Sequence, residues 1–294
     1  MIEIVEVGPR DGLQNEVVVL SVETRIELIR RMERAGAGRI ETVSFAHPRH
    51  VPQMAGAEEI CATLTERSFS AIGLVLNERG LDRALGCDLD EINCVAYAAD
   101  GYSLKNSDAP AAERNAEAAA LVARAKTAGR RVSVTIAVAF GDPVDGAVPP
   151  GHVADMAAVF AAAGADEIAL GDTIGAGNPV AVERLVPAVI AAVGKVGVRC
   201  HFHNTRNAGY ANAVAAVRSG VGALDASVGG FGGSPFSPGA GGNVATEDLT
   251  ALLRDMGIPT SIDPWLAAET GTWLAGALGH DRAPAMLGRV ARPG

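Results

Sequence analysis

The sequence predicts an α/β protein, a (β/α)8 TIM barrel with a short C-terminal helical extension. The first observation is a regular alternation, repeated eight times along the 294 residues, of short apolar runs with longer segments whose apolar residues recur every three or four positions. The second is that the runs are too apolar to be half exposed, as expected for parallel strands covered by helices. The third is that several of the longer segments end at a glycine able to cap a helix, such as Gly36, Gly129, Gly164 and Gly220.

The elements follow from these patterns in chain order. The expected strands cover residues 2–7, 39–45, 71–76, 91–96, 132–140, 167–170, 198–203 and 224–228. The helices with the clearest periodicity cover residues 22–35, 110–128, 153–163, 180–193, 208–219 and 246–256, and residues 264–277 and about 284–290 also look helical. We therefore expect a catalytic barrel over residues 1–256 and a helical extension over residues 257–294 packed on it. Periodicity cannot show that a sheet closes, so a doubly wound open sheet remains the alternative.

The composition excludes several classes of protein. A net charge of −9 and a sequence pI near 5.2 argue against a nucleic-acid-binding surface, because affinity for phosphate backbones needs clustered cations. The four cysteines, at positions 61, 87, 94 and 200, show no CxxC spacing, which favours reduced thiols over a disulfide or zinc scaffold. No apolar stretch approaches about 20 residues, so we expect no membrane contact and a soluble, cytoplasmic protein.

Polar residues gather where the expected strands end. In a barrel of this type the catalytic groups come from the C-terminal ends of the strands and the loops after them. Four strand ends carry such residues, namely Arg10, Asp11, Gln14, Glu41, Ser44, Asp172, Thr173, His201 and His203. The eighth strand leads into a glycine-rich loop, residues 229–243, whose fifteen residues are enough to close over a ligand.

Two imidazoles and a carboxylate indicate a metal site. Positions i and i+2 of a strand face the same side, so His201 and His203 can both point into the barrel mouth. With Asp11 and an amide oxygen such as that of Asn243, the donors are nitrogen and oxygen with no thiolate. That set suits an octahedral Mg2+ or Mn2+ ion better than a structural zinc. The alternative is that the histidines fill a polar layer of the core.

Arginine and lysine positions narrow the chemistry. Arg10 could form an ordinary salt bridge with Asp11, but at a barrel mouth it would be a fixed cation for a developing enolate or carboxylate oxygen. A Schiff-base aldolase needs a lysine at a strand end. The lysines, at positions 105, 126 and 195, are expected in a loop, a helix and a helix-to-strand connection. Carbon–carbon bond chemistry at this site would therefore use a metal.

Several long motifs resemble one known family. They are GPRDGLQNE at residues 8–16, IETVSF at 40–45, VPQMA at 51–55, GDTIG at 171–175, HFH at 201–203 and GGNVATEDL at 241–249. In this order they resemble the 3-hydroxy-3-methylglutaryl-CoA lyase family, a group of metal-dependent TIM-barrel enzymes related to isopropylmalate synthase. The resemblance runs from residue 5 to about residue 256 and covers nearly the whole barrel.

The resemblance implies an activity and a role for each site residue. The activity is the retro-Claisen cleavage of a 3-hydroxyacyl-CoA, such as 3-hydroxy-3-methylglutaryl-CoA, into acetyl-CoA and a keto acid. The implied metal ligands are Asp11, His201, His203 and Asn243, the implied cation on the thioester carbonyl is Arg10, and the implied supporting acids are Glu41 and Asp172. The segment after the fourth strand resembles the CoA entrance, so Lys105 and Asn106 are expected to meet the carrier; a solvated lysine is the alternative. We also expect a homo-oligomer, either a dimer or a tetramer.

One departure from the family pattern bears on the substrate. The family has a cysteine in the glycine-rich loop that handles a proton at the acetyl carbon, and Ser234 stands in its place here. A hydroxyl is a far weaker acid than a thiol, whose reference pKa is about 8.5, so Ser234 would need a relay. Asn204 also replaces a common aspartate. Three hypotheses follow: a lyase for the usual substrate or a relative with another C3 substituent, a condensing acyl-CoA enzyme, and a catalytically impaired, non-enzymatic barrel.

Overall fold

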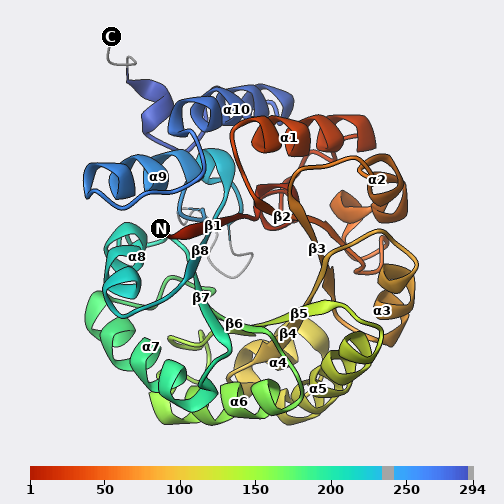
Figure 1. Ribbon diagram of the computed structural model, residues 1–294, viewed down its shortest axis with the longest axis vertical. Coiled ribbons are helices and arrows are strands. Elements are labelled where there is room, and N and C mark those ends of the chain that lie inside the picture. The colour runs from red at the N-terminus through yellow and green to blue at the C-terminus, as the bar shows by residue number, and fades with distance from the viewer. Residues whose placement is uncertain (234–241, 291–294) are drawn as a thin grey trace.

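A computed structural model describes residues 1–233 and 242–290. Its eight strands form a closed barrel in which each strand lies beside its neighbour in sequence and β8 closes against β1 (Figure 1). All the pairs are parallel. The predicted barrel is confirmed, and the open-sheet alternative is wrong. The strands are β1 (Glu3–Glu6), β2 (Arg39–Ser44), β3 (Ser70–Val75), β4 (Glu91–Tyr97), β5 (Arg131–Ala137), β6 (Glu167–Asp172), β7 (Gly197–Phe202) and β8 (Ala223–Ala226).

The helices form a ring around the barrel (Figure 1). Those that the periodicity predicts lie within a few residues of their expected bounds, except that the segment at about 284–290 holds only the short 3-10 turn η4 (Leu287–Arg289). Three shorter ones, α2, α3 and α4, have at most 8 residues each, too few for a helical period to stand out. The helices are α1 (Val22–Arg34), α2 (Ala57–Thr63), α3 (Glu78–Leu85), α4 (Asp100–Ser107), α5 (Ala111–Thr127), α6 (Pro150–Ala162), α7 (Pro179–Val193), α8 (Gly209–Arg218), α9 (Thr246–Asp255) and α10 (Pro264–Ala277).

Helix α4 corrects one prediction. Lys105 lies in this helix and not in a loop. The segment is rich in Gly, Ser, Asn and Asp, which are weak helix formers, so its sequence alone does not indicate a helix. Tertiary contacts stabilise it, because Asp145 accepts a hydrogen bond from the Gly101 N–H at 2.7 Å and Asp142 accepts one from the Tyr102 N–H at 2.8 Å. Carboxylates at the first turn satisfy donors that a helix leaves unpaired.

Helix α10 packs on the outside of the barrel beside α1 and α9 (Figure 1). It begins at the predicted residue, because Asp263 caps it by accepting from the N–H groups of Trp265 and Leu266, and Pro264 fits the first helical position. The segment before it is tied to the N-terminal part of the chain, where the Asp263 N–H donates to the Ala35 carbonyl at 2.7 Å. A division into a catalytic barrel over residues 1–256 and an extension over 257–294 stays a prediction.

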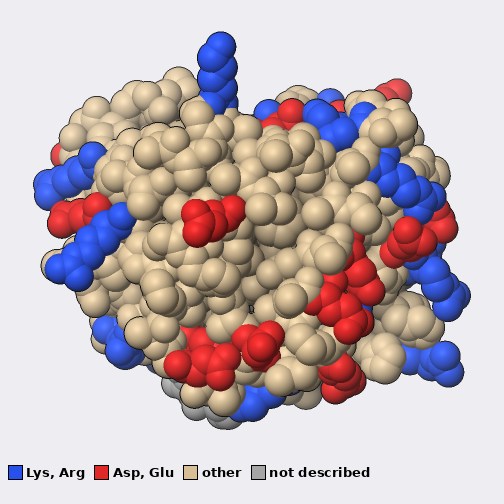
Figure 2. Space-filling model, turned by 90° about the horizontal axis from the view of Figure 1, so that it is seen from below, with Lys and Arg blue, Asp and Glu red and all other residues tan. Residues whose placement is uncertain are grey.

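The surface and the cysteines agree with the composition. On the face shown in Figure 2, lysine and arginine side chains stand mainly near the rim and are interspersed with acidic ones. All four cysteines are buried and free of disulfides. Among the described residues, no helix combines the length and the apolar character needed to cross a bilayer.

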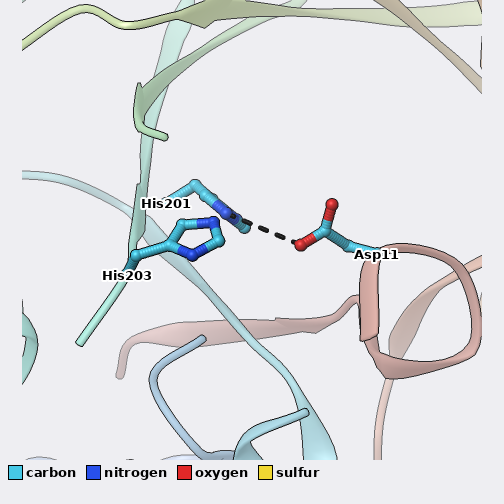
Figure 3. A group of neighbouring side chains, drawn as sticks. All are labelled: Asp11, His201 and His203. Carbon is cyan, nitrogen blue, oxygen red and sulfur yellow. Dashed lines mark ion pairs between the residues drawn. The ribbon is translucent and has the colours of Figure 1, made fainter. Parts of the chain in front are cut away.

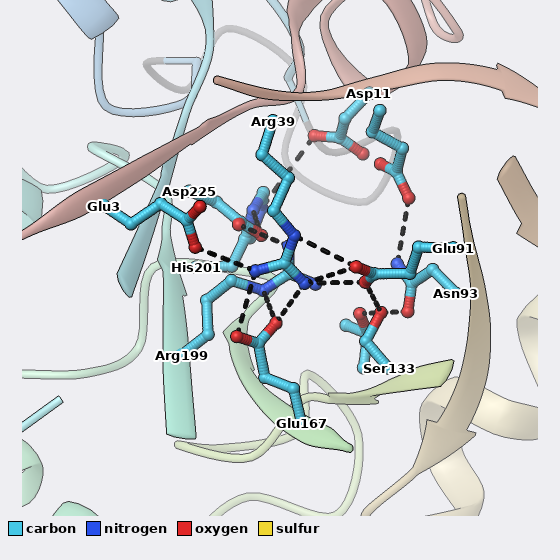
Figure 4. A network of polar contacts seen from close by, with 12 residues as sticks. Glu3, Asp11, Arg39, Glu91, Asn93, Ser133, Glu167, Arg199, His201 and Asp225 are labelled. Atoms are coloured by element: carbon cyan, nitrogen blue, oxygen red, sulfur yellow. Dashed lines mark hydrogen bonds and ion pairs between the residues drawn. The ribbon is translucent and has the colours of Figure 1, made fainter. Parts of the chain in front are cut away.

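The floor of the barrel holds a network of buried charges (Figure 4). Alternate strands β2, β4 and β6 supply its first layer, as the packing of such barrels predicts. Arg39 pairs with Glu91 at 2.7 Å and with Glu167 at 2.6 Å. Above this layer, Arg199 of β7 reaches Glu167 at 3.2 Å and Asp225 of β8 at 3.2 Å. Because these side chains are all buried, each charge depends on its partner in place of water.

Removing Arg39 tests this dependence. Arg39→Met should lower the free energy of unfolding by about 3 kcal/mol or more, since it leaves two buried glutamates short of a cation. The matched control is Arg34→Met, because Arg34 pairs with Glu27 on the surface, where its side chain is 59% exposed, and such pairs contribute about 1 kcal/mol or less. Urea denaturation of the two variants gives the comparison, and equal losses would contradict the role of the network.

Candidate active site

A cavity of about 430 Å3 opens at the C-terminal ends of the strands. Residues from β1 to β8 and their loops line it, which is where barrels of this kind place their chemistry. Three of the lining residues combine two imidazoles with a carboxylate, namely Asp11, His201 and His203. Asn106, Tyr97 and Tyr102 line it from the β4 side, and His47 and His50 from the loop after β2.

A tight turn after β1 presents Arg10 and Asp11 to the cavity. The N–H groups of Arg10, Asp11 and Gly12 donate to the Val7 carbonyl at 3.1, 2.7 and 3.2 Å, which winds the chain into the element η1 (Gly8–Gly12). The turn packs closely on the end of β8, and a Cβ atom at Gly12 would lie 2.6 Å from the Ser227 hydroxyl oxygen. Gly12 of the GPRDG motif therefore allows an approach that a larger residue would permit only if the Ser227 side chain moved.

Asp11, His201 and His203 form a compact group (Figure 3). One potential ligand atom from each lies within 4.8 Å of the others. The His201 Nε2 atom is 3.8 Å from the Asp11 Oδ2 atom, and the two imidazole centroids are 5.1 Å apart. His201 belongs to β7 and His203 follows its last residue, so the alternation along the strand brings both rings to the same side, as the sequence predicts.

Asn243 completes the group from behind Asp11. It lies across from His203 in an isolated β-bridge, and its amide nitrogen donates to Asp11 Oδ2 at 2.7 Å. The Asn243 Oδ1 and His203 Nδ1 atoms are buried and have no hydrogen-bond partner within residues 1–233 and 242–290. Buried nitrogen and oxygen atoms that lack a hydrogen-bond partner and lie beside a carboxylate are suitable ligand atoms for a divalent cation. The residues therefore fit such an ion.

Electrostatics favours the ligand-competent forms of two of these groups. Burial would raise the pKa of Asp11, but the charges of Arg10, His201 and His203 hold it well below its usual range. Burial and the neighbouring His201 lower the pKa of His203 to about 4. At neutral pH the site thus offers a carboxylate and a neutral imidazole, the forms that bind metals.

Arg10 is held rigidly at the edge of the cavity. Its Nε donates to Glu41 Oε2 at 2.6 Å and its Nη1 to Asp11 Oδ1 at 2.7 Å. Glu41 does not line the cavity, and its other oxygen accepts from Asn93 at 2.9 Å. Arg10 therefore does form salt bridges, and these fix its guanidinium at the mouth of the barrel. Glu41 affects the cavity only by holding Arg10 in this position.

The remaining predicted residues lie in different places. Asp172, at the end of β6, accepts from the Gly177 N–H at 2.9 Å and shapes the loop after it; burial raises its pKa to about 6. Asn106 lines the cavity and donates to the Tyr97 hydroxyl at 2.7 Å. Lys105 is exposed and does not line the cavity. Ser234 lies outside the described residues.

Asp225 and Tyr97 were not predicted from the sequence, whereas Tyr102 begins the segment that resembles the CoA entrance. Asp225 of β8 lines the cavity and contacts the His201 Nδ1 atom at 3.2 Å. The signal available was a single carboxylate inside the apolar run of β8. Tyr97, the last residue of β4, belongs to no motif that the sequence showed.

Two buried glutamates anchor the start of the glycine-rich loop. Glu6 of β1 accepts from the N–H groups of Gly8 and Val228 and from the Thr246 hydroxyl. Glu247 of α9 accepts from the Gly229 N–H at 3.0 Å. Burial raises the pKa of Glu6 to about 7 and the pKa of Glu247 to about 8.

Comparisons with known proteins agree on one family. The model of the HMGL-like family matches residues 1–270. The (R)-citramalyl-CoA lyase of Chloroflexus aurantiacus is 41% identical over 98% of this chain and 94% of that protein. The hydroxymethylglutaryl-CoA lyase of Pseudomonas mevalonii is 38% identical over 99% of this chain and 97% of that protein. The solved structure of an HMG-CoA lyase from Acinetobacter baumannii, in complex with coenzyme A and 3-methylmalate, superposes with a TM-score of 0.93, 34% identity and coverage of 99% and 95%.

The anchoring glutamates predict a pH dependence of stability. Because burial raises the pKa of Glu247 from 4.5 to about 8, its contribution to the free energy of unfolding is fully present below pH about 4.5 and is lost as the pH rises through about 8. Glu247→Gln removes this titration. The stability of the wild type should therefore fall relative to that of the variant between pH 5 and pH 8, measured by urea denaturation at intervals.

The matched control is Glu66→Gln, an exposed glutamate, which should follow the wild-type curve. A constant difference between wild type and Glu247→Gln across this range would show that Glu247 stays ionised in the folded protein.

Proposed function

The chain belongs to the HMGL-like family, and from this premise we propose that it is a divalent-metal-dependent carbon–carbon lyase. It cleaves a 3-hydroxyacyl-CoA by retro-Claisen chemistry to acetyl-CoA and a keto acid. The main observation behind the proposal is that one cavity is lined both by a group of possible metal ligands, Asp11, His201 and His203, and by the guanidinium of Arg10, which Glu41 holds in place. Relatives that span nearly the whole chain are named as CoA-ester lyases.

The reaction assigns a task to each group. The C3 hydroxyl gives its proton to a basic group of the site, the C2–C3 bond breaks, and its electron pair passes to the thioester as an enolate, leaving a ketone at C3; an acid of the site then returns a proton to C2 and gives acetyl-CoA. Asp11, His201, His203 and Asn243 would hold Mg2+ or Mn2+, which supplies a Lewis acid. Arg10 stabilises the negative charge on the enolate oxygen, and Glu41 keeps the guanidinium in place.

Two further residues, which are not among the residues seen to line the cavity, also receive a proposed role. We propose Asp172 as a supporting acid of the site, because it stands between the cavity-lining residues Gly171 and Thr173 and a carboxyl with a pKa of about 6 can exchange a proton near neutral pH. We propose Ser234 as the group in the position that handles the proton at C2. Contact of Lys105 and Asn106 with the CoA carrier, a cytoplasmic location and assembly as a homodimer or homotetramer also stay proposals.

A substrate screen tests the function. Citramalyl-CoA carries its carboxylate directly on C3 and would yield pyruvate, whereas 3-hydroxy-3-methylglutaryl-CoA carries a carboxymethyl group and would yield acetoacetate. Each is offered with Mg2+ or Mn2+, and both acetyl-CoA and the keto acid are quantified. We expect cleavage of at least one. Acetyl-CoA incubated with pyruvate tests the condensing alternative, and formation of citramalyl-CoA, or of citramalate and free CoA after hydrolysis by water, in that arm alone would replace the lyase by a condensing enzyme.

The same screen applied to Ser234→Cys reports on the loop. If the serine is a weakened proton donor, the thiol should raise cleavage of 3-hydroxy-3-methylglutaryl-CoA, by less than the roughly 10²- to 10⁴-fold that a well-placed general acid provides. If the loop serves another acyl-CoA, the variant loses activity on that substrate. No change on any thioester would place Ser234 outside the chemistry.

Arg10→Lys tests the role of the guanidinium. The variant keeps the charge but loses the fork that binds Glu41 and Asp11 together. If Arg10 stabilises the developing enolate, kcat should fall by about 10²-fold with a smaller change in KM. Arg34→Lys, at the exposed pair with Glu27, is the control and should leave both constants unchanged. A rise in KM alone would make Arg10 a substrate anchor.

A further inference from the structure

The two ring nitrogens of His201 have different carboxylate neighbours. Its Nε2 faces Asp11, 3.8 Å away, and its Nδ1 is 3.2 Å from Asp225 Oδ2. His201 and Asp225 are direct partners in the register of β7 and β8, so the contact is set by the barrel itself and not by a loop. Asp225 is buried, with 7% of its surface exposed.

The other oxygen of Asp225 is taken by a buried arginine. Arg199 Nη1 lies 3.2 Å from Asp225 Oδ1. Arg199 stands two residues before His201 on β7, so the two side chains point to the same side of the strand. Only 1% of Arg199 is exposed. Figure 4 shows the contacts continuing from Arg199 to Glu167 and Arg39 on the barrel floor.

We propose that Asp225 is a positioning residue of the metal centre and that Arg199 holds it in that task. A carboxylate can only accept a hydrogen bond, so the proton of a neutral His201 ring resides on Nδ1, and the lone pair of Nε2 is directed at Asp11. A partner on the second nitrogen fixes both the tautomer and the rotation of a metal-binding imidazole. The inference rests on the proposed metal site.

Arg199 adds a second restraint. The ion pair of Oδ1 with Arg199 and the contact of Oδ2 with His201 both favour the present orientation of Asp225, in which neither oxygen replaces Asp11 as a ligand. Arg199 also balances a negative charge that would otherwise be buried beside Asp11. The floor network therefore extends upward to the metal ligands through a single buried pair.

The test measures Mn2+ alone, with no substrate, on purified metal-free protein. Asp225→Asn keeps the size of the side chain and removes its charge, and Asp225→Ala removes the acceptor. We expect Mn2+ to bind about 10- to 100-fold more weakly to both variants, the usual effect of removing such a partner, as measured by isothermal titration calorimetry. His201→Ala marks the loss of a ligand.

The matched control is Glu91→Gln. Glu91 belongs to the same buried network but contacts Arg39, Arg131 and Ser133 and neither histidine. It should lower thermal stability while Mn2+ affinity stays within about threefold of the wild type. If Glu91→Gln weakens Mn2+ as much as Asp225→Asn, or if neither Asp225 variant weakens it, the proposal is overturned.

Nitrogen NMR of the imidazoles separates this inference from the proposed function. At a pH high enough for the His201 ring to be neutral, wild-type protein without metal should show the Nδ1–H tautomer, and Asp225→Ala should lose that preference. A wild type that binds no Mn2+ would remove the metal site, whereas a His201 tautomer indifferent to Asp225 would remove the positioning role even if Mn2+ binds. If the alanine variant does not fold, Asp225→Leu, which also removes the acceptor but keeps more of the volume, carries the same comparison.

Discussion

A closed barrel leaves its interior charges without water, and in this protein that constraint ties the floor to the mouth. Arg39 and Arg199 are balanced by Glu91, Glu167 and Asp225 inside the strands. A shift of one residue in the register of any of these strands would turn its charged side chain outward and leave the partners of that side chain buried without a counter-charge. The register that satisfies the charges is also the one that sets His201 opposite Asp225. Charge balance at the floor and the position of His201 at the mouth thus depend on the same strand register.

The mouth is built differently, from turns that are held by carboxylates. The backbone carbonyl of Val7 accepts hydrogen bonds from three N–H groups in the turn of Arg10 and Asp11. The carboxyl groups of Glu6 and Glu247 accept hydrogen bonds from backbone N–H groups where the glycine-rich loop begins. Since backbone donors cannot be left unpaired in a buried turn, these acids fix where the loops start. Rigid elements then carry the reactive groups, and the longer loops are left to vary around them.

Much of this could be predicted from the sequence, for physical reasons. Strand and helix positions follow from apolar periodicity, and the Asp11, His201 and His203 group follows from alternation along a strand together with strand-end placement. Closure of the sheet, the short helix α4 and the role of Asp225 could not be predicted, because each depends on contacts between segments far apart in the chain. Asp225 in particular gains its meaning only from the pairing of β7 with β8.

The closure of the barrel also governs the order in which the chain can fold as it is synthesised. β1 pairs with β8, so that Glu3 lies opposite Ala223, and the Ile2 N–H donates to the carbonyl of Pro259. One edge of β1 therefore stays without its partner until almost the whole polypeptide has been made. Contacts of such long range slow folding and leave an open strand edge exposed in the meantime. The charged residues at the two ends of β1, Glu3 and Glu6, make this temporarily unpaired edge a poor template for pairing with another chain.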